Sequence, residues 1–288
     1  MIDLSVRRRL FAEEIEAVAN LRTPALIEAL ASVPRERFLR AGPWLVRAES
    51  DVGGPPRATP DADPRHVYHN YAIGIDPPRQ LFNGAPSLLA MSIDALMLKP
   101  GDRVLHLGAG LGYYSALIAH AVGATGRLVA IEVDEGLALE ARENLRTMPW
   151  VEVRHGNGTG PLGETFDAML INAGVTHPQD TWLDALSAKG RMVLPLTVTS
   201  PAMGTISKGL MVRLSASGDA PRDTFALRVM TLVAIYAGIG LRDDAINEQL
   251  GAALMRGPFP PLKRLRRDPH EATAACWVHT AGCCVSLD

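Results

Sequence analysis

The stretch VLHLGAGLGYYSA, Val104–Ala116, joins a near-continuous hydrophobic run to a glycine-rich turn and then to an apolar segment that can form a helix. Gly108, Gly110 and Gly112 carry no Cβ, so they let the backbone turn sharply and approach a ligand closely. Glycine-rich turns also serve packing alone. The stretch by itself therefore leaves ligand binding and packing equally open, and the pattern around it has to decide between them.

Strands and helices alternate from about residue 84 to residue 200. Parallel strands need crossover connections, which are usually helices, so this spacing predicts a mainly parallel sheet covered on both faces. The expected fold is α/β, with a doubly wound sheet. The predicted strands are 103–108, 127–133, 151–156, 166–174 and 191–198, and the predicted helices are 86–98, 113–123, 135–148 and 181–190.

The flanking regions follow other patterns. Helical periodicity covers 10–50, with Thr23 as an expected N-cap and Pro24 in the first helical position. A Gly/Pro/Asp-rich loop is expected over 51–64. In the tail we expect one long strand or two over 225–240, a helix over 243–257 and a strand pair around Gly282. These patterns predict an N-terminal helical region with an acceptor-side loop, a cofactor-binding core and a C-terminal α+β extension, over 1–83, 84–204 and 205–288.

Composition narrows the class of protein. The chain of 288 residues is 47% hydrophobic and 21% charged, with a formal net charge of −2, which argues against nucleic acid or an anionic membrane as the main partner. No apolar run is long enough to span a bilayer, and the N-terminus does not resemble a signal peptide. Cys276, Cys283 and Cys284 form no defensible zinc pattern, and the eight histidines lack metal-ligand spacing. We expect a cytoplasmic protein with reduced thiols and no metal site.

Glu132 favours ligand binding at the glycine turn. It ends the run VAIE in the second predicted strand, 20 residues after Gly112, where a carboxylate can accept hydrogen bonds from both hydroxyls of a ribose. The turn reads G-x-G-x-G rather than the G-x-G-x-x-G of dinucleotide proteins, and no P-loop lysine follows it. A ligand that has a ribose but no phosphates, S-adenosylmethionine, fits better. A solvated strand-end carboxylate is the alternative.

A second turn, GNGTG at 156–160, follows the third predicted strand. The side-chain carbonyl of Asn157 can accept a hydrogen bond from the adenine amino group, and Gly158 and Thr159 can offer backbone contacts. The simpler interpretation is an ordinary Asn-Gly turn.

Several segments resemble the protein-L-isoaspartate (D-aspartate) O-methyltransferase family of class I methyltransferases. The resemblance covers 33–198 and is carried by VPRERFL at 33–39, YHNYAIGI at 68–75 and NGAPSLLAM at 83–91, followed in the family's order by the glycine turn, VAIEVDEG, GNGTG, FDAMLINAG and GRMVLPL. It implies a Rossmann-like methyltransferase sheet, S-adenosylmethionine as cofactor, and a wall between cofactor and substrate at 81–84. The candidate cofactor-binding residues are Leu81, Phe82, Gly84, Gly108, Ala109, Gly110, Gly112, Tyr113, Glu132, Val133, Asn157, Gly158, Thr159 and Asn172; the candidate catalytic residue is Asn83.

The chain departs from the family's pattern at the acceptor side. Where the family has a Ser-x-Pro triplet, this sequence has Asn83, Gly84 and Ala85, with the proline displaced to Pro86. Asn157, Asn70 and His106 replace acidic residues that are usual in the family. Within a strand, His106 is interpreted as a buried, hydrogen-bonded histidine. The loss of Ser-x-Pro puts isoaspartate repair in doubt.

The expected activity is methylation of a carboxylate on a peptide or protein. A carboxylate has a pKa near about 4 and is already ionised at neutral pH, so it needs no general base. A hydroxyl or amine acceptor would need one, and Tyr68, His69 and Tyr71 are the candidates. The alternatives are a small-molecule methyltransferase and a cofactor-binding protein without turnover. The basic residues of 263–267 are interpreted as a solvated face rather than a peptide-binding one. The sequence leaves the acceptor, the oligomeric state and the role of 205–288 open.

Overall fold

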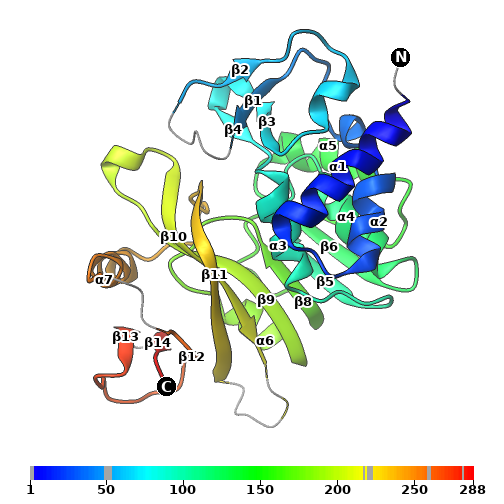
Figure 1. The fold of residues 1–288 in the computed structure, drawn as a ribbon. Helices are drawn as coiled ribbons and strands as arrows, with labels where there is room; N and C mark the ends of the chain where they lie inside the picture. Colours follow the sequence, from blue (N-terminus) through cyan, green and yellow to red (C-terminus); the bar gives the residue numbers. More distant parts are fainter. Residues whose placement is uncertain (1–2, 49–53, 217, 219–222, 258–260, 281) are drawn as a thin grey trace. The chain divides into compact units, whose positions relative to one another are not determined.

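The structure is a computed structural model that describes residues 3–48, 54–216, 218, 223–257, 261–280 and 282–288 (Figure 1). The chain forms two compact units. The first unit comprises Met1–Asp102 and Ala109–Gly156, and the second comprises Arg103–Gly108 and Asn157–Asp288. Positions 51–53 of the expected loop lie outside the described residues. The division into 1–83, 84–204 and 205–288 that the sequence suggests stays a prediction.

The first unit contains the helical N-terminal region and two sets of strands. The helical pattern expected over 10–50 is wrong beyond Ser32, where α2 ends, because a 3-10 turn at Arg35–Phe38 and strand β1 at Leu45–Ala48 follow. A small antiparallel sheet has the order β2-β1-β3-β4, and β6 pairs in parallel with β7. Thr23 is the N-cap of α2 and Pro24 opens the helix, as expected, although the threonine side chain makes no capping bond. The elements are α1 Leu4–Ala19, α2 Pro24–Ser32, β1 Leu45–Ala48, β2 Arg57–Ala58, β3 Tyr71–Asp76, β4 Leu81–Phe82, α3 Pro86–Asp94, α4 Tyr113–Val122, β6 Arg127–Glu132, α5 Glu135–Leu145 and β7 Val151–His155, with short 3-10 turns at Arg35–Phe38, Pro64–Val67 and Pro77–Arg79.

Helices α4 and α5 both pack on β6. Nearly every side chain of α4 is buried, and Gly112 and Gly123 mark its two ends. Helix α5 is amphipathic, with Leu137, Ala138, Ala141 and Leu145 on its buried face. Strand β6 is therefore covered by apolar side chains, and its last residue, Glu132, is held where the strand ends.

The sheet of the second unit is parallel in its first part and antiparallel in the rest. Strands β5, β8 and β9 pair in parallel, whereas β9, β10, β11, β12, β14 and β13 pair antiparallel in that order. Figure 1 shows β10 and β11 as a long twisted pair. The elements are β5 Arg103–Leu107, β8 Phe166–Ile171, α6 Asp180–Ala185, β9 Leu186–Val198, β10 Ile206–Ser215, β11 Thr224–Tyr236, α7 Asp244–Leu254, β12 Arg264–Arg266, β13 Cys276–His279 and β14 Cys284–Ser286, with a 3-10 turn at Pro201–Met203.

The tail contains the three features expected from the sequence and two strands, β10 and β12, that were not expected. One strand, β11, covers the 225–240 segment as far as Tyr236, α7 is the expected helix, and β13 and β14 are the expected pair. The three cysteines are free thiols. Within the described residues, no helix is both long and apolar enough to span a bilayer.

The predicted helix over 181–190 is wrong in its second half. Helix α6 ends at Ala185, and β9 starts at Leu186, which pairs with Phe166. The register then shifts, and pairing resumes at Arg191 opposite Ala168. Gly190 permits this irregularity, because a Cβ there would lie 2.6 Å from Cγ of Leu186. Strand pairing overrides the helical pattern here.

Candidate functional site

Glu132 is the most constrained of the predicted site residues. Its side chain ends β6 and the residue is 7% exposed. Oε2 accepts a hydrogen bond from the backbone N–H of Gly110 at 2.7 Å, and Oε1 accepts one from the N–H of Asp134 at 3.1 Å. The carboxylate therefore ties the glycine turn to the start of α5 and is itself fixed in orientation.

The glycine turn of the first unit needs its glycines for conformation and space. Gly110 and Gly112 have φ values of +55° and +94°, in the left-handed region that favours glycine. A Cβ on Gly110 would meet Cδ1 of Ile75 at 3.3 Å, and one on Gly112 would meet Cδ1 of Leu145 at 3.0 Å. The N–H of Ala109 donates to the carbonyl of Ile131 at 3.2 Å. The turn is thus bonded to β6 twice, through a main-chain carbonyl and through Glu132.

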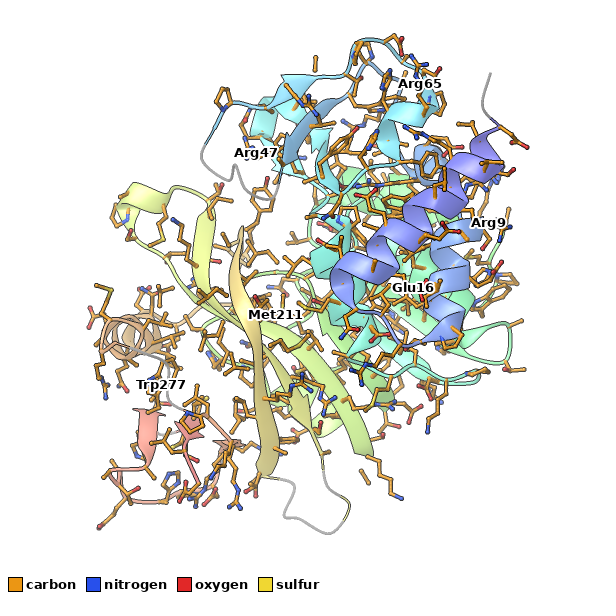
Figure 2. All side chains as sticks on the ribbon, viewed as in Figure 1. Arg9, Glu16, Arg47, Arg65, Met211 and Trp277 are labelled. Atoms are coloured by element: carbon orange, nitrogen blue, oxygen red, sulfur yellow. The ribbon has the colours of Figure 1, made fainter. Side chains whose placement is uncertain are left out.

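The predicted acceptor loop lies against the same turn. Leu81 packs on a cluster of Ile75, Leu111 and Leu137. Gly84 has a φ of +80°, and its carbonyl accepts a hydrogen bond from the hydroxyl of Tyr114 at 3.0 Å. Phe82 is buried beneath the guanidinium of Arg47, whose Cζ is 4.4 Å from the ring centroid (Arg47 is labelled in Figure 2). The first unit therefore brings the 81–84 loop, the glycine turn and Glu132 together.

Asn83 is bonded to the neighbouring strand through both its backbone and its side chain. Its N–H donates to the carbonyl of Ile73, and its Oδ1 accepts from the N–H of Ile73, both at 2.9 Å. The side chain thus extends the pairing of β3. Asn70 also acts locally, since its Oδ1 accepts from the N–H of Ser87 in the first turn of α3.

Arg35 is a buried residue whose role the sequence did not reveal. It is 0% exposed, and it donates to the carbonyl oxygens of Val67, His69 and Tyr71 at 2.7, 3.1 and 3.0 Å. Its guanidinium also lies over the ring of Tyr113 at 5.6 Å. Arg35 thereby joins the 33–39 and 68–75 segments and supports the first residue of α4. The only sequence signal is its place in VPRERFL, because a burial of this kind leaves no periodic pattern.

The three proposed proton acceptors of the first unit differ in their chemistry. Burial, reinforced by a hydrogen bond to Glu36, raises the pKa of Tyr68 to about 12, and burial also raises the pKa of Tyr71. Burial lowers the pKa of His69, so its imidazole is neutral at pH 7. Of the three, His69 alone is in the protonation state that a general base needs at neutral pH.

In the second unit, Asn172 holds Gly108. The N–H of Asn172 donates to the carbonyl of Leu107 at 2.8 Å, and its Nδ2 donates to the carbonyl of Gly108 at 3.2 Å. A Cβ on Gly108, whose φ is +82°, would lie 2.7 Å from the Asn172 carbonyl oxygen. His106, on β5, is fully buried, and burial lowers its pKa to about 3, so it stays neutral and performs no acid–base work at ordinary pH.

The Asn157 turn closes on itself. Oδ1 of Asn157 accepts from the N–H of Thr159 at 3.2 Å and from its hydroxyl at 2.8 Å, and the carbonyl of Gly158 accepts from Nε1 of Trp182 at 2.7 Å. Gly240, in the extension, lies against the same side chain, since a Cβ there would be 2.8 Å from Nδ2 of Asn157. The simpler interpretation, an Asn-Gly turn, therefore matches the local geometry, and binding of adenine stays a prediction.

The remaining predicted residues occupy defined places. Tyr113 is buried and carries Phe38 against its ring, with centroids 5.8 Å apart, so it backs the glycine turn. Val133 is exposed directly after Glu132. In the first unit the structure brings together Leu81, Phe82, Asn83, Gly84, Ala109, Gly110, Gly112, Tyr113, Glu132 and Val133; in the second unit lie Gly108 with Asn172, and Asn157 with Gly158 and Thr159.

The sequence matches known proteins over this region. The model of the family described as Protein-L-isoaspartate(D-aspartate) O-methyltransferase (PCMT) matches residues 59–209. The protein-L-isoaspartate O-methyltransferase of Methylorubrum extorquens is 30% identical over 237 residues, which cover 80% of this chain and 89% of that protein. The enzyme of the same name from Roseiflexus castenholzii is 29% identical over 226 residues, covering 77% of this chain and 84% of that protein.

Solved structures agree in fold. A protein-L-isoaspartate O-methyltransferase aligns with a TM-score of 0.60 at 19% identity, covering 88% of this chain and 72% of that one. A Plasmodium falciparum protein, described as a putative protein-L-isoaspartate O-methyltransferase in complex with S-adenosyl-L-homocysteine, aligns with a TM-score of 0.60 at 14% identity, covering 80% and 97%. These likenesses confirm the Rossmann-like methyltransferase fold. The chain therefore belongs to the protein-L-isoaspartate (D-aspartate) O-methyltransferase family, and is an S-adenosylmethionine-dependent methyltransferase.

Proposed function

We propose that this chain transfers the methyl group of S-adenosylmethionine to a carboxylate of a peptide or protein. The observation that carries the proposal is the Glu132 carboxylate, fixed by the N–H groups of Gly110 and Asp134. A carboxylate has about four lone-pair sites, so these two bonds leave capacity for the two hydroxyls of a ribose. The two carboxylate oxygens of Glu132 are therefore oriented before the cofactor binds.

Each side chain then has a defined task toward the cofactor. The bound cofactor supplies an electrophilic methyl group on its sulfonium sulfur. Gly110 allows its backbone to come close, and Glu132 accepts the ribose hydroxyls. We assign the adenine end to Asn157, Gly158 and Thr159, whose turn is already closed by internal hydrogen bonds. Catalysis in this scheme rests on alignment of acceptor and methyl group, which is worth several kcal/mol in well-oriented reactions.

The raised pKa values of Tyr68 and Tyr71 favour a carboxylate acceptor and leave His69 as the one candidate base for any other acceptor. Tyr68 and Tyr71 hold their protons more tightly than free tyrosine does, so neither activates a hydroxyl at neutral pH. A carboxylate acceptor is already ionised at neutral pH, so it needs no proton transfer to either tyrosine. We place the enzyme in the cytoplasm, a reducing compartment that keeps its three cysteines out of disulfides.

The acceptor itself is proposed to differ from the damaged aspartyl residue after which the family is named. The resemblance places a serine of that family where this chain has Asn83, and Oδ1 of Asn83 is already bonded to the N–H of Ile73. What Asn83 offers an acceptor is its amide N–H, a donor suited to a carboxylate oxygen. A peptide carboxylate in another setting fits this loop.

Two measurements test the proposal. Conversion of S-adenosylmethionine to S-adenosylhomocysteine is followed with an isoaspartyl peptide and with peptides bearing ordinary side-chain and terminal carboxylates. The product is then treated with mild base, which releases methanol from a methyl ester but leaves N-methyl and ether products intact. We expect a base-labile product, formed better from the second set of peptides. A base-stable product would refute the carboxylate assignment, and preference for the isoaspartyl peptide would refute the changed acceptor.

The dependence of the rate on pH gives an independent check. With a carboxylate acceptor, kcat/KM stays level as pH falls from about 9 to about 5, because a carboxylate with a pKa near about 4 is ionised throughout. With His69 as base, kcat/KM would fall as pH drops through the lowered pKa of that imidazole and would vanish in His69→Ala.

A further inference from the structure

The C-terminal strands bring two histidines and two cysteines into one cluster, which we call the His270 cluster: His270, Cys276, His279 and Cys284. One ligand atom from each of the four lies within 4.8 Å of the ligand atoms of the other three. The cluster belongs entirely to the second unit and to the extension beyond the family match at 59–209. The proposed methyl transfer uses none of these residues.

A β-bulge creates this arrangement. Cys276 pairs with Ser286, Val278 pairs with Val285, and His279 pairs with Cys284, so Trp277 is the extra residue of β13 (Trp277 is labelled in Figure 2). In a regular strand, positions three apart point to opposite faces. The bulge cancels that alternation, so Cys276, His279 and Cys284 share one face. Val278 and Val285 share the other face, where both are buried.

His270 reaches the same place from the segment before β13. Its Nε2 lies 3.9 Å from Sγ of Cys276, and its ring centroid is 4.7 Å from that of His279. On its other side, Nδ1 lies 2.8 Å from the carbonyl oxygen of Asp268. A proton on Nδ1 makes that contact a hydrogen bond and leaves the lone pair of Nε2 toward the cluster. Metal-binding histidines usually have such a partner for the second ring nitrogen.

His279 and Cys276 show the remaining features of ligands. Nδ1 of His279 is buried, and within the described residues it has no hydrogen-bond partner. Coordination to a cation gives this nitrogen the partner it otherwise lacks. Sγ of Cys276 lies 3.4 Å from the N–H of Thr273, a donor that stabilises a thiolate. Arg266 adds no free positive charge, since its guanidinium is paired with Asp268 at 2.6 Å.

We propose that the His270 cluster binds one Zn²⁺ ion as a structural site. Two thiolates and two imidazoles match the S₂N₂ donor set that zinc takes in tetrahedral geometry, and four protein ligands leave no open position for a substrate. Two thiolates also balance the two charges of the ion, so no net charge is buried. With Zn–S of about 2.3 Å and Zn–N of about 2.0–2.1 Å, sulfur and nitrogen ligands lie about 3.6 Å apart, close to the observed 3.9 Å.

The metal would fasten a segment that lacks regular secondary structure. Strands β12, β13 and β14 have 3, 4 and 3 residues, and 267–275 contains neither helix nor strand. The ion would tie this segment, through His270, to the β13–β14 pair. Small elements of this kind commonly depend on a disulfide or a metal for stability.

Metal content of the full chain tests the proposal. The protein is produced with added Zn²⁺, purified without chelator and measured by inductively coupled plasma mass spectrometry. We expect about one zinc per chain, and at least a fivefold loss in Cys276→Ser and in His279→Ala. The matched control is Cys283→Ser, because Cys283 is adjacent to the cluster but not part of it, and it should keep the full amount.

X-ray absorption of the unaltered, zinc-loaded chain decides the matter even if a variant does not fold. We expect two sulfur and two nitrogen ligands at the zinc edge. Zinc well below one per chain, zinc retained in both ligand variants, an equal loss in Cys283→Ser, or a shell without sulfur would each overturn the proposal.

Discussion

Glu132 is the last residue of β6 and Asn157 follows its parallel neighbour β7, yet the hydrogen bonds of the two side chains serve different purposes. Glu132, in the first unit, accepts from Gly110, a residue 22 positions earlier, and so fixes a distant turn. Asn157, in the second unit, accepts at its Oδ1 from the N–H and the hydroxyl of Thr159, within its own turn. A charged acceptor that spans two segments holds a shape those segments would not keep alone. A local turn forms whether or not a ligand is present.

This contrast predicts that cofactor affinity depends more on the Glu132 side than on the Asn157 side. The largest expected effect comes from Gly110→Val. A valine at φ +55° introduces strain of ~1–3 kcal/mol and displaces the N–H that bonds Glu132, whose charged hydrogen bond is worth ~1.5–3 kcal/mol. Affinity for S-adenosylhomocysteine, measured by calorimetric titration, should fall at least ~60-fold.

Gly123→Val is the matched control for that substitution. Gly123 also has a positive φ, at +67°, and nothing lies within 4 Å of a Cβ built there. It should lower thermal stability while leaving cofactor affinity nearly unchanged. Equal losses of affinity in the two variants would mean that general instability, not the turn, weakens binding.

Glu132→Ala comes next in size. Removing the carboxylate deletes the acceptor for the ribose and frees the Gly110 N–H, so affinity should weaken by ~1.5–3 kcal/mol, or ~10-fold to 150-fold. Glu132→Gln, which keeps one acceptor oxygen, should fall between. The exposed carboxylate of Glu143, on α5, provides the control variant Glu143→Ala. Unchanged affinity in a folded Glu132→Ala protein would contradict the assignment of Glu132 as the acceptor for the ribose hydroxyls.

Asn157→Ala should have a smaller effect on affinity. It removes the neutral hydrogen bonds to Thr159, so we expect a loss of ~0.5–1.5 kcal/mol, or ~2-fold to 12-fold. Asn157→Asp keeps the acceptor oxygen and the turn, and should bind nearly as well as the unaltered chain. A loss as large as that of Glu132→Ala would erase the contrast between the two regions.

Substitutions of Asn83 are expected to affect cofactor affinity least. Two of them distinguish a structural role of this residue from a catalytic one. Asn83→Ala loses the bond from the Ile73 N–H, which should lower Tm by a few degrees, at ~2–4 °C per kcal/mol. Asn83→Asp keeps that acceptor and removes the amide donor, so Tm should stay while kcat/KM falls. If kcat/KM is unchanged in Asn83→Asp, the residue has only the structural role, and the acceptor must be oriented elsewhere.

The parts of the fold that follow periodic patterns could be predicted, because buried apolar residues recur in the sequence at the period of the helix or strand that contains them. Strand ends at Glu132 and helix starts after Gly112 are of this kind. The start of β9 at Leu186 could not be predicted, since pairing with Phe166 outweighs a local helical pattern. Side-chain partners were also out of reach: neither the bond from Asn83 to Ile73 nor the closed turn of Asn157 is visible without coordinates.

The His270 cluster shows a different limit. Histidines and cysteines examined as separate sets show no ligand spacing, but together they read H-x5-C-x2-H-x4-C. The short C-x2-H step was the available signal. Even so, the register shift at Trp277, which puts both ends of that step on one face, depends on pairing with β14 and leaves no trace in composition.

Arg35 has a consequence for how the first unit opens. Its guanidinium donates to the carbonyls at positions 67, 69 and 71. If any of these carbonyls moves away, the buried cation loses a hydrogen bond that water does not replace. Local fraying of 64–76 independent of 33–39 is therefore disfavoured. In native-state hydrogen exchange the two segments should exchange as one cooperative unit with a shared opening free energy, and Arg35→Met should split them into two.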